Sequence, residues 1–180
     1  MHEQSNSLSE QDGELNPSGV SQKNDSSKRG YEIRITHSSL KFSSAHFLID
    51  HEKCGYLHGH NYYVSLLITG PIRESAMLID FIQLKKLVRE ECAQLDHKIL
   101  IPLCSPYLEI ATTEKSIKIK ASNKFYMFPR EDCALLDLEA VTSELLAFYC
   151  WRALAPHLPG KRFSVFIEET PGAVAKYGDI

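Results

Sequence analysis

Hydrophobic and polar positions alternate along several stretches of the chain, as they do in β-strands that bury one face. From Tyr31 to Ile35 the apolar residues occupy odd positions, whereas from Leu40 to His46 the same face uses even positions. If one strand runs through both halves, it needs a bulge or a change of side around residues 36–40, because side chains alternate strictly along a strand.

A second alternating run begins at His58 and continues its face through Tyr62 and Ile68. Gly70 and the proline after it end this run, since both residue types interrupt a strand. The runs on either side of the Cys54 segment therefore predict a long antiparallel hairpin with a loop at its tip. A third alternating run covers residues 163–169, and a short last strand is expected over residues 174–177.

Two helices are expected between these strands. Asp80, followed three residues later by Gln83, is typical of a helix start, and apolar residues then recur at helical spacing to about Leu95. Thr142 or Ser143 caps a second helix that prolines close after residue 155. Between the helices, residues 103–138 read as an insertion with a small hairpin over 116–128. The order predicts an α+β fold, a four-stranded antiparallel sheet with two helices packed on one face.

Composition narrows the class of protein. The chain has 180 residues, of which 43% are hydrophobic and 24% charged, with a formal net charge of -3. This balance gives no bulk attraction to nucleic acid or to an anionic membrane. Residues 1–29 are too polar to offset the entropy of ordering, so we expect a disordered tail before a single domain at 30–180. No apolar run is long enough to span a bilayer and no signal peptide is evident, which predicts a cytoplasmic protein.

Metal-binding chemistry is concentrated at the start of the second strand run. His58 and His60 point to the same face, with Gly59 between them, so both imidazoles can reach one ion. Zinc needs at least three protein ligands, and His46, on the expected partner strand, is the third candidate. Apart from His97, the remaining histidines lack such neighbours and are expected at the surface: His2, His37, His51 and His157.

The five cysteines are odd in number and contain no CxxC pair, so a disulfide framework is not expected. Cys54 lies four residues before His58, and two interpretations of its role are open. As a fourth zinc ligand it would close the site into an inert cage. As a free thiol beside the metal it would be a base or nucleophile.

Two further groups are candidates for chemistry. Asp96 and His97 leave the first helix together, although adjacent side chains tend to diverge, so they are not an obvious pair in which the acid orients the imidazole. The histidine could equally interact with the helix C-terminus. Glu169 ends an apolar strand face, whereas its neighbour Glu168 lies on the other face.

Six motifs together resemble the family of 6-pyruvoyl-tetrahydropterin and 6-carboxytetrahydropterin synthases. They occur in the family's order: Phe42-Ser43-Ser44-Ala45-His46, Cys54 through Tyr62, Leu78-Ile79-Asp80-Phe81, Leu95-Asp96-His97, Thr142-Ser143-Glu144 and Glu169-Thr170. The resemblance spans most of residues 31–179 and leaves out the tail and much of 103–138.

The resemblance implies a tunnelling fold, in which sheets of several subunits form a barrel with active sites at subunit interfaces. It therefore implies a homo-oligomer built on trimers, a hexamer being one form. It assigns zinc to His46, His58 and His60, catalysis to Cys54, Asp96 and His97, and pterin anchoring to Glu169. Thr142, Ser143 and Glu144 match a segment that lines the pterin pocket.

The three-residue gap between Cys54 and His58 is similar to the carboxytetrahydropterin branch. The implied reaction converts 7,8-dihydroneopterin triphosphate to 6-carboxy-5,6,7,8-tetrahydropterin, acetaldehyde and triphosphate, with zinc as a Lewis acid, on the route to queuosine-type tRNA nucleosides. Lys53 and Lys98 are candidate cations for the triphosphate. Alternatives are the pyruvoyl-forming enzyme, a glutamate-dependent branch that makes 6-hydroxymethyl-dihydropterin (Glu52 lies near Cys54), and a non-catalytic assembly module stabilised by zinc.

Overall fold

The computed structural model describes residues 30–49, 51–72 and 76–180. The predicted tail at 1–29 lies outside the described residues, and the domain boundary at residue 30 stays a prediction. None of the helices in these ranges is long and apolar enough to cross a membrane.

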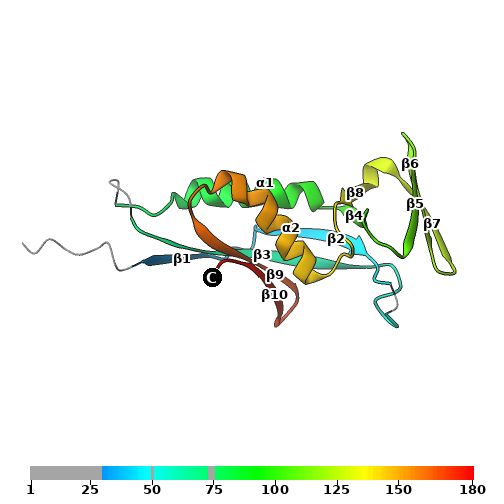
Figure 1. Ribbon diagram of the computed structural model, residues 1–180, viewed down its shortest axis with the longest axis horizontal. Coiled ribbons are helices and arrows are strands. Elements are labelled where there is room, and N and C mark those ends of the chain that lie inside the picture. Colours follow the sequence, from blue (N-terminus) through cyan, green and yellow to red (C-terminus); the bar gives the residue numbers. More distant parts are fainter. Residues whose placement is uncertain (1–29, 50, 73–75) are drawn as a thin grey trace, which may run out of the picture.

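A seven-stranded sheet forms the main layer (Figure 1). Its strands are β1 (Tyr31–Ile35), β2 (Lys41–His46), β3 (His58–Gly70), β4 (Lys98–Pro102), β8 (Cys133–Leu136), β9 (Arg162–Thr170) and β10 (Ala173–Gly178). The order is β10-β9-β3-β2-β4-β8, and β1 also pairs with β3. The predicted hairpin is β2 and β3, and the predicted last strand is β10.

The prediction of a four-stranded, purely antiparallel sheet was wrong. Strand β4 pairs in parallel with both β2 and β8, so the sheet is mixed. The sequence signal for β4 is weak because Leu100 and Ile101 are both fully buried, one on each face. A strand buried on both faces has no alternating pattern, and a short apolar run cannot be told from other buried segments by periodicity.

The change of side between β1 and β2 was predicted correctly. Ile35 pairs with Leu66 and Lys41 pairs with Tyr63, so the five residues 36–40 face only two on β3. The three extra residues are an odd number, which exchanges the two faces. The side chains that pack on the core therefore come from odd positions such as Ile35 in β1 and from even positions in β2.

Both predicted helices are present, and their caps were predicted correctly. Helix α1 (Phe81–Leu95) begins after Asp80, whose side chain accepts hydrogen bonds from the backbone N–H groups of Ile82 and Gln83. Helix α2 (Ser143–Leu154) begins after Thr142. Their buried residues join one cluster with the even-numbered face of β3, so both helices pack on the same face of the sheet.

The insertion folds as a separate three-stranded sheet at one end of the molecule (Figure 1). Its strands are β5 (Leu108–Thr112), β6 (Ser116–Ala121) and β7 (Lys124–Pro129), followed by the short 3-10 helix η1 (Arg130–Asp132). A second short 3-10 helix, η2 (Ala155–His157), follows α2 elsewhere in the chain. The hairpin of β6 and β7 was predicted, whereas β5 was not. A second apolar cluster joins this sheet to Phe47, directly after β2.

Candidate metal centre and active site

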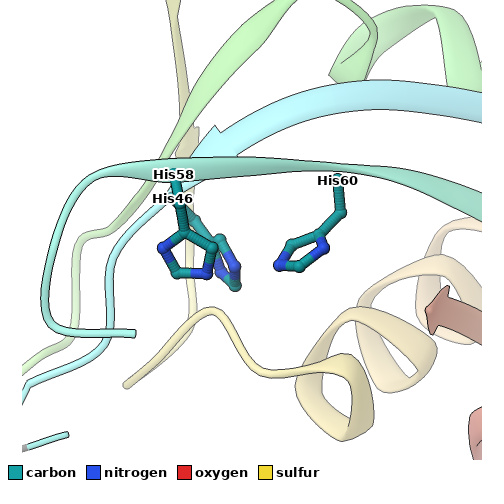
Figure 2. Close-up of side chains that lie close together, drawn as sticks. All are labelled: His46, His58 and His60. Atoms are coloured by element: carbon teal, nitrogen blue, oxygen red, sulfur yellow. The ribbon is translucent and has the colours of Figure 1, made fainter. Parts of the chain in front are cut away.

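Three histidines converge on the helix-covered face of the β2–β3 hairpin (Figure 2). His46 pairs across the strands with His58, and Ser44 pairs with His60, so all three side chains project from the same side. One ligand atom from each lies within 4.8 Å of the others. Antiparallel pairing thus brings His46 to the two-histidine motif, as the sequence predicted.

Backbone carbonyls fix two of the imidazole rings. His46 Nδ1 donates to the carbonyl of Val141 at 2.8 Å, and His58 Nδ1 donates to the carbonyl of Tyr56 at 2.7 Å. A histidine that donates through one ring nitrogen presents the lone pair of the other, so Nε2 of each ring is available to a metal. Burial lowers the pKa of His46, which keeps this ring neutral and able to act as a ligand. The donor set therefore fits a zinc ion.

Glu169 contacts two of the three histidines. Its Oε1 lies 3.4 Å from His46 Nε2 and 3.5 Å from His60 Nε2. Because burial outweighs this carboxylate in its effect on the pKa of His46, the pair is not a fully charged ion pair. Glu168 instead accepts a hydrogen bond from Gly172 N–H in the β9–β10 turn. The distinction between the two glutamates is therefore as the strand pattern indicated.

Tyr62 is a site residue that the sequence suggested only as part of an apolar face. Its hydroxyl donates to Glu169 Oε1 at 3.2 Å and lies 3.2 Å from His46 Nε2. Burial, followed by the charge of Glu169, raises the pKa of Tyr62, so it remains a hydrogen-bond donor. A tyrosine next to two histidines on the same face of an alternating run was the available signal. Tyr62 therefore orients the Glu169 carboxylate.

Tyr62→Phe is expected to reduce the free energy of unfolding by about 1 kcal/mol, the usual net value of one buried hydrogen bond. The ring and its stack on Phe42 remain, so the fold is retained. Urea unfolding of the variant measures the change. Tyr63→Phe, at the exposed neighbouring position, is the matched control and should unfold like the unaltered protein. Equal stability of the two variants would show that the Tyr62 hydroxyl contributes nothing.

Cys54 lies in a loop that we call the Cys54 loop, residues 51–57. Leu48 N–H donates to the Cys54 carbonyl at 2.7 Å, and His51 Nδ1 accepts from Cys54 N–H at 3.1 Å. His51 is exposed, as predicted, yet it positions this loop. Glycine is required at Gly55, where a Cβ would approach the His51 carbonyl oxygen to 2.4 Å. Cys54 is half-buried and does not belong to the group of metal-capable side chains found among the described residues.

Asp96 and His97 form a hydrogen-bonded pair, contrary to the expectation that their side chains diverge. Asp96 Oδ2 lies 2.8 Å from His97 Nδ1. His97 has a φ of 58°, a left-handed conformation that turns its side chain back toward Asp96. Asp96 Oδ1 also accepts from Ser43 N–H at 2.7 Å, and this bond is the main reason that the pKa of Asp96 is lowered.

His97 does not belong to the three-histidine group. It lines an open hollow of about 520 Å³ with Ser43, Asn61 and His60. Ser43 and Asn61 hydrogen-bond to each other. They occupy odd positions along their strands, whereas the three histidines occupy even positions, so the two sets of side chains point to different faces of the hairpin. Within one chain, the predicted acid and histidine lie outside the group of metal-capable side chains.

The segment before α2 begins beside His46, whose ring donates to Val141. Thr142 Oγ1 accepts from Leu145 N–H and so caps the helix. The Ser143 hydroxyl is buried and has no hydrogen-bond partner in the described part of the chain, whereas Glu144 is exposed. Of the three predicted pocket residues, Ser143 is therefore the one whose polar group is both buried and unpaired among the described residues.

The role of the two candidate lysines stays a prediction. Lys98 donates to the carbonyl of Glu131 and lines the hollow that also contains His97 and His60. Lys53 is exposed in the Cys54 loop. Lys124, in the insertion, was missed because nothing in the sequence relates it to residue 55. Its Nζ donates to the Gly55 carbonyl at 2.6 Å.

The α+β fold carries a three-histidine centre and a separate cysteine loop on its mixed sheet, and these features define a candidate metal-dependent enzyme. The family model for 6-pyruvoyl tetrahydropterin synthase matches residues 35–179. The chain therefore belongs to the 6-pyruvoyl tetrahydropterin synthase family, which confirms the resemblance found in its motifs.

Similar proteins come from archaea and from malaria parasites. A Methanocaldococcus jannaschii protein, provisionally named 6-carboxy-5,6,7,8-tetrahydropterin synthase, is 37% identical over 134 residues, which are 74% of this chain and 82% of the relative. A Pyrococcus horikoshii protein with the same provisional name is 30% identical over 147 residues, covering 79% and 88%. The solved 6-pyruvoyl tetrahydropterin synthase of Plasmodium falciparum has a TM-score of 0.78 at 29% identity, covering 83% and 98%.

The Plasmodium vivax enzyme has also been solved with a catalytic glutamate replaced by alanine. That structure has a TM-score of 0.77 at 30% identity and covers 84% of this chain and 98% of its own.

Proposed function

We propose that this protein is a zinc-dependent 6-carboxy-5,6,7,8-tetrahydropterin synthase. It would convert 7,8-dihydroneopterin triphosphate and one water to 6-carboxytetrahydropterin, acetaldehyde and triphosphate, a step toward 7-deazaguanine nucleosides of tRNA. The observation that carries the proposal is the separation of Cys54 from the three-histidine group. An open metal centre with a nearby thiol suits catalysis, whereas a closed four-ligand cage suits a structural site. The archaeal relatives' names support the choice of branch.

Each residue of the site has a distinct task in this reaction. His46, His58 and His60 would hold the zinc, which when bound supplies Lewis acidity toward the oxygens of the substrate side chain. Glu169, oriented by Tyr62, accepts two parallel hydrogen bonds from the amino-pyrimidinone edge of the pterin. Cys54 as a thiolate removes a proton from the substrate side chain. Thr142, Ser143 and Glu144 would line the pterin pocket.

His97 and Asp96 would act on a substrate held by another subunit. Their absence from the three-histidine group of their own chain supports this arrangement. The bond from Asp96 sets the orientation of His97, which then gives or receives the second proton. A homo-oligomer built on trimers provides the required contact between subunits.

Co-expression of a Cys54→Ala chain with a His97→Ala chain tests this arrangement. Neither variant alone should turn over substrate, whereas mixed oligomers should recover about a quarter of normal activity, since random mixing gives that share of sites both intact groups. The measurement is pterin formation by the purified mixture, with each variant alone as the control. Failure to recover activity in oligomers shown to contain both chains would contradict a shared site.

The reaction itself is tested by incubating the purified protein with zinc and 7,8-dihydroneopterin triphosphate and identifying the products. Acetaldehyde together with 6-carboxytetrahydropterin supports the proposal. The second candidate is 6-pyruvoyl tetrahydropterin formation, which the Plasmodium neighbour's name favours and which releases no acetaldehyde. Formation of 6-hydroxymethyl-dihydropterin would instead place the chain in the glutamate-dependent branch, with Glu52 as the residue to test.

A further inference from the structure

Lys124 links the insertion to the Cys54 loop. It begins β7, directly after the two-residue turn of Ser122 and Asn123, in which Ser122 has a φ of 54°. Its ammonium donates to the Gly55 carbonyl at 2.6 Å and lies 4.1 Å from the centroid of the Tyr56 ring. A charge-assisted hydrogen bond and a cation–π contact thus come from one half-buried side chain.

The two residues that Lys124 contacts separate the thiol from a metal-ligand candidate. Gly55 follows Cys54, and its N–H donates to the His51 carbonyl at 2.8 Å. The Tyr56 carbonyl accepts from His58 Nδ1 at 2.7 Å. A shift of residues 55 and 56 would therefore move both the Cys54 backbone and the group that orients the His58 ring.

The hairpin that carries Lys124 is itself held against the centre. Tyr126 on β7 stacks on Phe47, with ring centroids 4.9 Å apart and an interplanar angle of 19°. Phe47 follows His46 directly and is buried with Ile117 and Ile119 of β6. The insertion therefore packs on the residue next to one histidine while Lys124 contacts the residues before another.

We infer that Lys124 is a positioning residue, through which the inserted sheet holds the Cys54 loop in one conformation relative to the three histidines. The inference rests on the proposed function only for the chemical role of Cys54. The order of the loop itself can be measured without substrate. Lys124 acts through Gly55 and Tyr56 and has no part in the chemistry.

The test compares Lys124→Met and Lys124→Arg with Lys118→Met, an exposed lysine on the same sheet that serves as the control. Amide hydrogen exchange of residues 54–56 should accelerate about 10-fold or more in Lys124→Met, because local opening becomes easier without the two contacts. In turnover, kcat should fall about 10-fold with KM unchanged, since a misplaced base weakens the chemical step but not substrate binding. Arginine retains the charge, the donor and the ring contact, so Lys124→Arg should lie within about threefold of the unaltered protein. Lys118→Met should match it.

Unchanged exchange at residues 54–56 in a folded Lys124→Met variant would overturn the inference. A raised KM with unchanged exchange would also overturn it, because Lys124 would then contact the substrate phosphates directly. Tyr56→Leu provides a second variant, in which the ring contact is lost and the Gly55 hydrogen bond stays. Its exchange rate at residues 54–56 should lie between those of Lys124→Met and the unaltered protein. If the unaltered protein forms no pterin product, the proposed function fails while the exchange data still decide the role of Lys124.

Discussion

His58→Ala is expected to abolish tight zinc binding and, with it, turnover. The ring lies opposite His46 across the hairpin and is fixed by the Tyr56 carbonyl, so it is held in place as one of the three candidate ligands. Loss of a partner outside the ligand set typically costs about 10–100-fold in metal affinity, and loss of a ligand should exceed this range. Zinc content after dialysis and competition with a chelator measure the effect.

The matched control for His58→Ala is His37→Ala, an exposed histidine whose ring contacts Ser39 in the turn between β1 and β2. It should bind zinc like the unaltered protein. Zinc affinity is also expected to fall on acidification, because the ligands must be neutral, and the lowered pKa of His46 moves the protonation of that ring to lower pH. Stoichiometric zinc in His58→Ala would place the metal elsewhere and refute the three-histidine centre.

Cys54→Ala is expected to lower kcat by about 10²–10⁴-fold, the usual contribution of a positioned acid or base. Zinc content should not change, because Cys54 lies outside the histidine group. Stability should also change little, since the loop is held by backbone bonds of residues 48, 54 and 55 that alanine retains. Product formation, zinc content and thermal unfolding are measured on the same preparation.

Cys104→Ala is the control for Cys54→Ala. Cys104 is exposed, and its thiol contacts Asp137, so its removal should leave both zinc and turnover unchanged. Loss of zinc together with unfolding in Cys54→Ala would identify Cys54 as a fourth ligand and the protein as a non-catalytic zinc-stabilised module. Full activity with zinc retained would show that another group, with Glu52 the first to test, moves the proton.

Short-range features of the sequence were sufficient to predict the three-histidine group. A period-two pattern determines which residues share a strand face, so His58 and His60 were assigned to one ion, and antiparallel pairing of the flanking run added His46. The caps Asp80 and Thr142 were equally predictable, because a capping side chain bonds to backbone groups two or three residues away. The change of side between β1 and β2 was also predictable, because the apolar residues occupy odd positions in the first run and even positions in the second.

Tertiary structure decided the features that depend on distant segments. The parallel pairing of β4, buried on both faces, has no periodic signal. The His97 ring contacts Asp96 where the backbone of His97 is left-handed, a conformation that no short-range pattern indicated. The contact between Lys124 and Gly55 spans 69 residues. By itself, the sequence determined which groups can bind a metal, since that depends on spacing of a few residues, whereas the fold decided what holds them, since such contacts form only after the chain has packed.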